Sequence, residues 1–138
     1  MSCNIKKLPS AKFIVYYYFP LLLWMGVIFY FSSQSGSGYP IKNWQFYVER
    51  KGAHIAEYFI LSILFLRIIF IKKRALIFRK KNWIPYLAVL IFSFSYAVFD
   101  ELHQLFVFGR EGKITDVGID VVGIILALLF YRMVKNKK

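Results

Sequence analysis

Four long apolar stretches, separated by shorter polar segments, organise the chain. They cover about residues 13–31, 55–71, 84–99 and 117–134. A helix rises about 1.5 Å per residue, so about 17–25 apolar residues cross a hydrocarbon core about 30 Å thick. The third stretch is the shortest, but residues 100–105 extend it by more than one helical turn. Each stretch is therefore predicted to be a membrane-spanning helix.

The composition indicates the same class of protein. Of the 138 residues, 59% are hydrophobic and 20% are aromatic, which is more than a soluble domain usually carries. The predicted fold is all-α, an integral membrane four-helix bundle with spans at about 13–31, 55–71, 84–104 and 117–134. We expect a single domain over residues 1–138.

The basic residues predict the orientation of this bundle. Thirteen of the nineteen lie before the first span, between the second and third, or after the fourth: Lys6, Lys7, Lys12, Lys72, Lys73, Arg74, Arg79, Lys80, Lys81, Arg132, Lys135, Lys137 and Lys138. Four spans place these segments on one side, which the positive-inside rule assigns to the cytoplasm, so both termini are predicted to be cytoplasmic. The net charge of +12 is then explained by contact with membrane lipid, and no nucleic-acid partner is expected.

The acidic residues are confined to the two polar segments that must face the opposite side. All seven acids and both histidines lie there or at the adjoining span ends: Glu49, His54, Glu57, Asp100, Glu101, His103, Glu111, Asp116 and Asp120. An ionisable group beside hydrocarbon is costly and persists mainly where it faces a bundle interior or a water-filled cavity. This clustering predicts a site at the outer face of the bundle.

Helical register refines this prediction, because at about 100° per residue the polar residues of each span share one face. The three faces consist of Arg50, Lys51, His54, Glu57 and Tyr58; of Ser93, Tyr96, Asp100, His103 and Gln104; and of Asp116, Asp120, Gly123 and Ala127. Small residues in the last face would let a neighbouring helix approach closely. We expect the three faces to converge on one outward-facing pocket, near His54, Asp100, His103 and Asp116, with Arg110 at its rim.

Several motifs in these segments resemble those of one known family. They are Asp100-Glu101-x-His103-Gln104, Gly109-Arg110, Asp116-x-x-x-Asp120-x-x-Gly123, Ser32-Ser33-Gln34 and Lys51-x-x-His54-x-x-x-Tyr58. Their order and spacing resemble the VanZ-like family of small bacterial membrane proteins from about Phe29 to Gly123. The resemblance implies a multi-pass protein of the bacterial cytoplasmic (inner) membrane that acts in the cell envelope. One departure is Asp120, where the family usually has Asn, so this chain carries an additional negative charge.

The resemblance and the residues together leave two functions open. The first is an outward-facing polar pocket for an anionic envelope component or lipid headgroup, such as a lipid-linked cell-wall precursor or a glycopeptide. The family's name comes from a member linked to teicoplanin resistance, so the resemblance implies a link to glycopeptide resistance. The alternative is a membrane-embedded hydrolase or transferase, metal-dependent or not, that acts on lipid-linked substrates. Whether the protein is an enzyme therefore stays open, as does its oligomeric state.

Candidate residues follow from the chemistry of each side chain. The catalytic candidates are His54, Asp100, Glu101 and His103, because imidazole and carboxylate groups transfer protons. Arg110 offers a planar fork for phosphate or carboxylate and Lys51 a point charge. The full set of binding candidates is Ser33, Gln34, Lys51, Tyr58, Gln104, Arg110, Asp116 and Asp120. No cofactor is assigned; if a metal binds, the expected ligands are His54, Glu57, Asp100 and His103. The same residues could instead form an ion-pair network that only holds the helix ends together.

Overall fold

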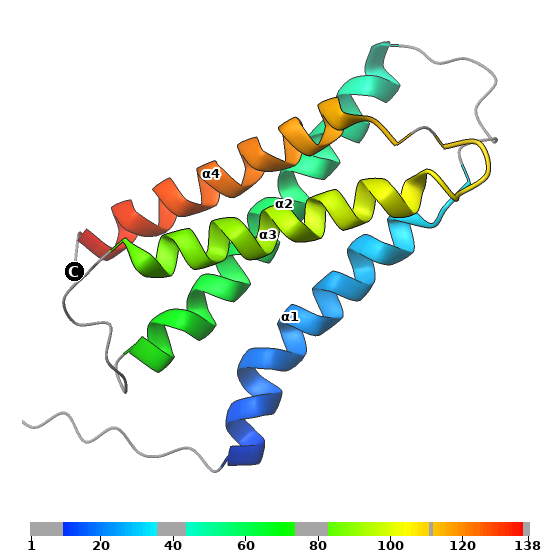
Figure 1. Cartoon of the computed structure of the whole chain (residues 1–138). Coiled ribbons are helices and arrows are strands. Elements are labelled where there is room, and N and C mark those ends of the chain that lie inside the picture. The colour runs from blue at the N-terminus through cyan, green and yellow to red at the C-terminus, as the bar shows by residue number, and fades with distance from the viewer. Residues whose placement is uncertain (1–9, 36–43, 74–82, 111, 137–138) are drawn as a thin grey trace, which may run out of the picture.

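The computed structural model of the chain describes residues 10–35, 44–73, 83–110 and 112–136. This part of the chain contains four helices and no strand (Figure 1): α1 Ser10–Ser32, α2 Trp44–Lys73, α3 Ile84–Gln104 and α4 Ile114–Asn136. The all-α, four-helix prediction is confirmed. Glu111 and most of the basic residues that predict the orientation lie outside the described residues.

Every helix contains a segment that is long and apolar enough to cross a membrane. These segments are Lys12–Ser32, Val48–Ile71, Ile84–Gln104 and Ile114–Lys135. Many large apolar side chains on them are exposed, including Phe19 of α1 and Phe130 of α4. Such exposure suits contact with lipid tails, so the protein is a multi-pass membrane protein.

The second helix differs most from its predicted bounds, because it begins at Trp44 rather than near residue 55. Hydropathy marks the part of a helix that suits hydrocarbon, whereas the backbone hydrogen bonds continue as long as the residues favour a helix. The added residues include Glu49, Arg50 and Lys51, whose long unbranched side chains are good helix formers. Arg50 and His54 therefore lie one turn apart on a regular helix.

Successive helices run in opposite directions, with α2 in contact with each of the other three. The α2–α4 contact is the most extensive, and α1 contacts α2 and α3. The ends of α1 and α3 and the starts of α2 and α4 lie together at one end of the bundle (Figure 1). We call this the acidic end. The start of α1 and the end of α4 lie at the opposite end, so both described ends of the chain are on one side.

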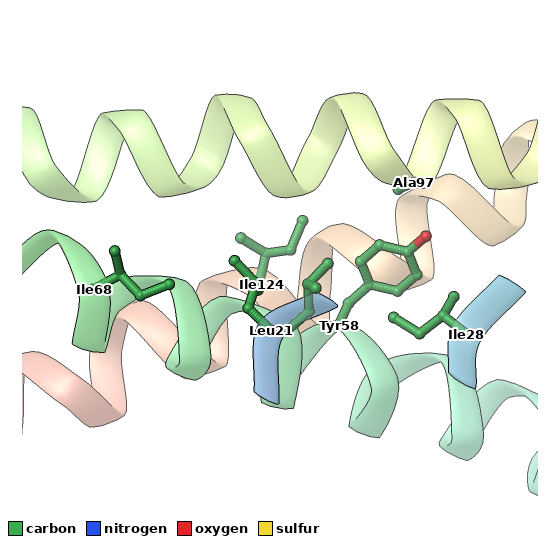
Figure 2. Packing of buried hydrophobic residues seen from close by; sticks show 7 residues of the cluster. Leu21, Ile28, Tyr58, Ile68, Ala97 and Ile124 are labelled. Atoms are coloured by element: carbon green, nitrogen blue, oxygen red, sulfur yellow. The ribbon is translucent and has the colours of Figure 1, made fainter. Parts of the chain in front are cut away.

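The interior below the acidic end is apolar and receives side chains from all four helices. Figure 2 shows this packing, in which the labelled residues are Leu21, Ile28, Tyr58, Ile68, Ala97 and Ile124. Tyr58 is fully buried, and its hydroxyl points toward α3 beside Ala97. The apolar interior fixes the helices side by side and thereby positions the polar residues above it.

Candidate functional site

Buried polar residues gather at the acidic end from three helices. His54 comes from α2, Asp100, Glu101 and Gln104 from α3, and Asp120 from α4, and all five are buried. We call these five, together with the half-buried Arg50 and Asp116, the polar cluster. Arg50 and His54, Asp100 and Gln104, and Asp116 and Asp120 are each four residues apart, so each helix turns its pair to one face, while Glu101 is adjacent to Asp100.

The shortest side-chain contact within the polar cluster joins α2 to α4. Nδ1 of His54 lies 3.0 Å from Oδ1 of Asp120. With the proton on Nδ1, the ring donates to the carboxylate, and Nε2 stays available as an acceptor. Because both side chains are buried, this pair is held in a low-dielectric environment where its interaction is strong.

A second chain of contacts joins α2, α3 and α4. Arg50 donates from Nη2 to Oε1 of Gln104 at 3.2 Å, and Gln104 donates from Nε2 to Oδ2 of Asp100 at 3.1 Å. The same Nη2 lies 4.0 Å from Oδ2 of Asp116. The basic residue of α2 that reaches the cluster is thus Arg50, whereas Lys51 is exposed. Arg50 lies one helical turn before His54 on the predicted polar face. This four-residue spacing is the sequence feature that indicates that Arg50 lies near His54.

Glu101 connects the polar cluster to the segment before α4. Its Oε2 accepts a hydrogen bond of 2.8 Å from the backbone N–H of Lys113. Gly112 lies so close to this turn that an added Cβ would be 2.6 Å from the carbonyl oxygen of Glu101. A residue with a side chain would not fit there without a shift of the backbone, so the sequence can bring Lys113 to Glu101 only because residue 112 is glycine.

Several buried polar atoms of this region have no hydrogen-bond partner among the described residues. They are Oγ of Ser32, Nε of Arg50, the hydroxyl of Tyr58, Oδ1 of Asp100, Oε1 of Glu101 and Oδ2 of Asp120. Buried polar atoms in folded proteins are nearly always paired, because an unpaired one loses its bonds to water without replacement. Their concentration at the acidic end distinguishes this region from ordinary helix packing.

His103 belongs to a different contact, between α3 and α1. Its ring stacks on Phe29 with centroids 4.5 Å apart, and its Nε2 lies 3.1 Å from Oγ of Ser33. Ser33 donates its hydroxyl proton to the carbonyl of Phe29, so the bond to His103 requires the ring to donate from Nε2. His103 and Ser33, both predicted site residues, therefore contact each other rather than the polar cluster.

Arg110 fixes the end of α1. It donates from Nη2 to the carbonyl of Phe31 at 2.7 Å and from Nε to the carbonyl of Gln34 at 2.8 Å. The last carbonyls of a helix lack intrahelical partners, and a basic side chain satisfies them well. Burial is the main cause that lowers the pKa of Arg110, followed by the charge of Arg50; the group stays charged because an arginine titrates so far above neutral pH. The fork expected to hold an anion is engaged with the protein's own backbone.

One group of metal-type ligands is brought together among the described residues. His54, Glu101 and Asp120 are all buried, and each offers a ligand atom within 4.8 Å of the others. Of the four ligands expected from the sequence, this group includes His54 but not Glu57, Asp100 or His103. Spacing along one helix could not reveal it, because its three members come from three different helices.

Comparison with known proteins gives one match, to a family model. The model described as VanZ/LLP1 matches residues 16–135, which include most of the first apolar segment, all of the other three and the whole polar cluster. No curated protein and no solved structure matches the chain.

Proposed function

This chain belongs to the VanZ/LLP1 family, and from that premise we propose that it is a membrane-embedded hydrolase or transferase. Its substrate would be the headgroup of a lipid or of a lipid-linked cell-envelope precursor, in the bacterial cytoplasmic membrane. The observation that carries the proposal is the buried pair of His54 and Asp120, 3.0 Å apart, beside two further buried acids. Apolar side chains would pack these helices at lower cost, so the pair favours a chemical role over a purely structural one.

The pair has the arrangement of a general base and the residue that orients it. Asp120 holds the His54 ring through Nδ1, which leaves Nε2 as the atom that takes a proton. In hydrolysis of a phosphate ester, the oxygen of water bonds to phosphorus while His54 takes the proton of the water. The bond from phosphorus to the lipid oxygen breaks, and the proton passes to that leaving oxygen. In a transfer reaction an alcohol takes the place of water.

The positive charge of Arg50 favours binding of an anionic substrate at the polar cluster. Its guanidinium bonds Gln104 and lies 4.0 Å from Asp116, yet its side chain is 31% exposed. Nε of Arg50 is buried and Nη2 bonds Gln104, so the exposed part of the guanidinium would reach a phosphate through its remaining N–H groups. The polar cluster lies toward one end of the bundle, and the ends of membrane-spanning helices are where headgroups meet the hydrocarbon. These features favour a phosphate-bearing headgroup over a neutral one.

The test compares turnover by the full-length protein and by a His54→Gln variant, both in lipid nanodiscs. Release of pyrophosphate from a polyprenyl pyrophosphate and of glycerol phosphate from phosphatidylglycerol is measured, and exchanged headgroups are identified by mass spectrometry. Loss of a general base typically lowers a rate by about 100-fold or more, so we expect at least that effect for His54→Gln. Ser95→Ala is the control, because Ser95 is exposed and its hydroxyl donates to the carbonyl of Ile91 on its own helix. Both variants should melt like the parent protein.

A non-catalytic binder is the second candidate, and the exposed part of Arg50 is the observation that favours it. A binder would retain these lipids in a flotation assay, lose them in Arg50→Ala, and release neither pyrophosphate nor glycerol phosphate. Turnover that survives His54→Gln would contradict the catalytic proposal directly.

The link to glycopeptide resistance is a separate proposal that comes from the family. Expression of the chain in a teicoplanin-susceptible bacterium should raise the teicoplanin concentration needed to stop growth. His54→Gln, expressed at the same level, should restore susceptibility. An increase that does not depend on His54 would separate resistance from the polar cluster.

A further inference from the structure

The group formed by His54, Glu101 and Asp120 has more negative charge than its neighbours compensate. Among the described residues, Asp120 forms its ion pair with His54, and Glu101 accepts a hydrogen bond from the backbone N–H of Lys113. Both acids are buried, and buried carboxylates are normally paired with a cation or bound to a metal. A neutral imidazole with two carboxylates carries two negative charges, which a divalent ion would balance.

Unpaired oxygens in the same group point to a missing ligand, independently of the charge. Oε1 of Glu101 and Oδ2 of Asp120 are both buried and without a partner among the described residues. The other oxygen of each acid is engaged, with the N–H of Lys113 and with His54 respectively. Each carboxylate thus has one oxygen positioned by the protein and one left available.

The distances suit a single ion. Two atoms that each lie about 2.1 Å from one ion are about 3 Å apart when they occupy adjacent positions of an octahedral site. A ligand atom of each of the three residues lies within 4.8 Å of the others. Nδ1 of His54 and Oδ1 of Asp120, 3.0 Å apart, share a proton in their hydrogen bond, and an ion would take the place of that proton. Side-chain adjustments that bring the ligand atoms to about 3 Å of one another would close the site around an ion.

We propose that His54, Glu101 and Asp120 together bind one divalent transition-metal ion such as Zn²⁺ or Mn²⁺. One imidazole and two carboxylates form a mixed nitrogen and oxygen set, which suits these ions better than Ca²⁺ or Mg²⁺, whose ligands are mainly oxygens. The three ligands come from α2, α3 and α4, so the ion also joins these helices at the acidic end.

The role of the ion rests on the proposed function, but its presence does not. In a hydrolase, an ion held here would make a water molecule easier to deprotonate. His54 would then hold the ion in place of its role as the proton acceptor, and its loss would still remove turnover.

Direct measurement of metal binding tests the site without a substrate. The full-length protein is purified in detergent through a tag that lacks histidine, stripped with a chelator, and loaded with Zn²⁺ or Mn²⁺. We expect about one ion per chain by elemental analysis and a higher melting temperature in the loaded protein, because the ion binds only the folded state.

Two matched variants identify the ligands. Glu101→Gln removes a charged ligand but keeps an oxygen for the N–H of Lys113, and it should weaken the affinity for the ion by at least about tenfold. Glu57→Gln makes the same change at a half-buried acid of α2 outside the group and should leave the affinity unchanged. Should Glu101→Gln fail to fold, Asp120→Asn replaces it, because the amide oxygen still accepts a bond from His54.

Several results would overturn the site. One is a stripped protein that neither binds Zn²⁺ or Mn²⁺ nor changes its melting temperature; another is an equal loss of affinity in Glu101→Gln and Glu57→Gln. Failure here is distinct from failure of the proposed function. Turnover by the stripped protein in the presence of chelator would exclude a catalytic role for the ion and leave the catalytic proposal intact. Metal binding without turnover would support the metal site and contradict the catalytic proposal.

Discussion

Arg50 and Lys51 are adjacent in the chain, and only one of them reaches the polar cluster. Consecutive residues of a helix differ by about 100° in direction, so a neighbouring residue of the same charge faces elsewhere. Arg50 donates to Gln104 and lies near Asp116, while Lys51 is exposed. The contacts of Arg50 and Lys51 therefore differ because the two side chains point in different directions from the helix, not because their chemistry differs.

Replacement of each residue by alanine should separate the two roles. Arg50→Ala removes the group that donates a hydrogen bond to Gln104 and the positive charge near Asp116. We therefore expect the free energy of unfolding to fall by about 1–2 kcal/mol. Lys51→Ala should change it by less than about 0.5 kcal/mol, as is usual for exposed positions. Thermal or denaturant unfolding in detergent measures both, and equal losses would show that the contacts of Arg50 contribute nothing specific.

At the scale of the helices, the close approach of α4 to α2 positions the polar cluster. Gly123 of α4 lies directly against the backbone of Ile55, next to His54, and a Cβ added there would overlap the Ile55 carbonyl. Glycine and alanine at such contacts let two membrane helices approach closely. Because Asp120 lies one turn before Gly123, this approach is what brings its carboxylate within 3.0 Å of His54.

Gly123→Ala should therefore destabilise the protein, although alanine is the better helix former. We expect a loss of about 1–3 kcal/mol, typical of an overpacked contact. Gly118→Ala on the same helix is the matched control, because nothing lies within 4 Å of its added Cβ, and it should be neutral or slightly stabilising. Comparable melting temperatures for the two variants would mean that α2 and α4 are not held this closely.

At the scale of the whole molecule, the antiparallel order of the helices places the polar cluster and the two described chain ends at opposite ends of the bundle (Figure 1). The basic segments belong with the chain ends. The positive-inside rule then predicts that the acidic end faces away from the cytoplasm.

Cysteine labelling in intact cells tests this orientation. In a protein with Cys3→Ser, a cysteine at Ser35 or Phe108 should react with an impermeant thiol reagent, because both positions are exposed at the acidic end. Phe108 is 83% exposed, whereas the nearby Gly112 is unsuitable for labelling because a side chain there would collide with the carbonyl of Glu101. A cysteine at Ala75, in the basic segment, should react only after the membrane is permeabilised. The reverse pattern of labelling would invert the orientation.

The sequence alone determined the fold class, because length and hydropathy decide which segments can cross a membrane. Register within each predicted helix also placed His54, Asp100 and Asp120 on inward faces, since 3.6 residues per turn is a property of the backbone itself. These three side chains are buried in the structure. The start of α2 was missed because its polar first turns carry no hydropathy signal.

Only the tertiary structure decided which of these side chains meet. His54 pairs with Asp120 rather than with Asp100, His103 contacts α1, and Arg110 bonds the last carbonyls of α1. Partners of this kind depend on the distance and rotation between helices, which are set by local packing such as that of Gly123 against Ile55. The spacing of residues along a helix determines the directions of their side chains on that helix, but not how two helices are placed relative to each other. The group of His54, Glu101 and Asp120, which come from three helices, could therefore not be predicted from spacing along the chain.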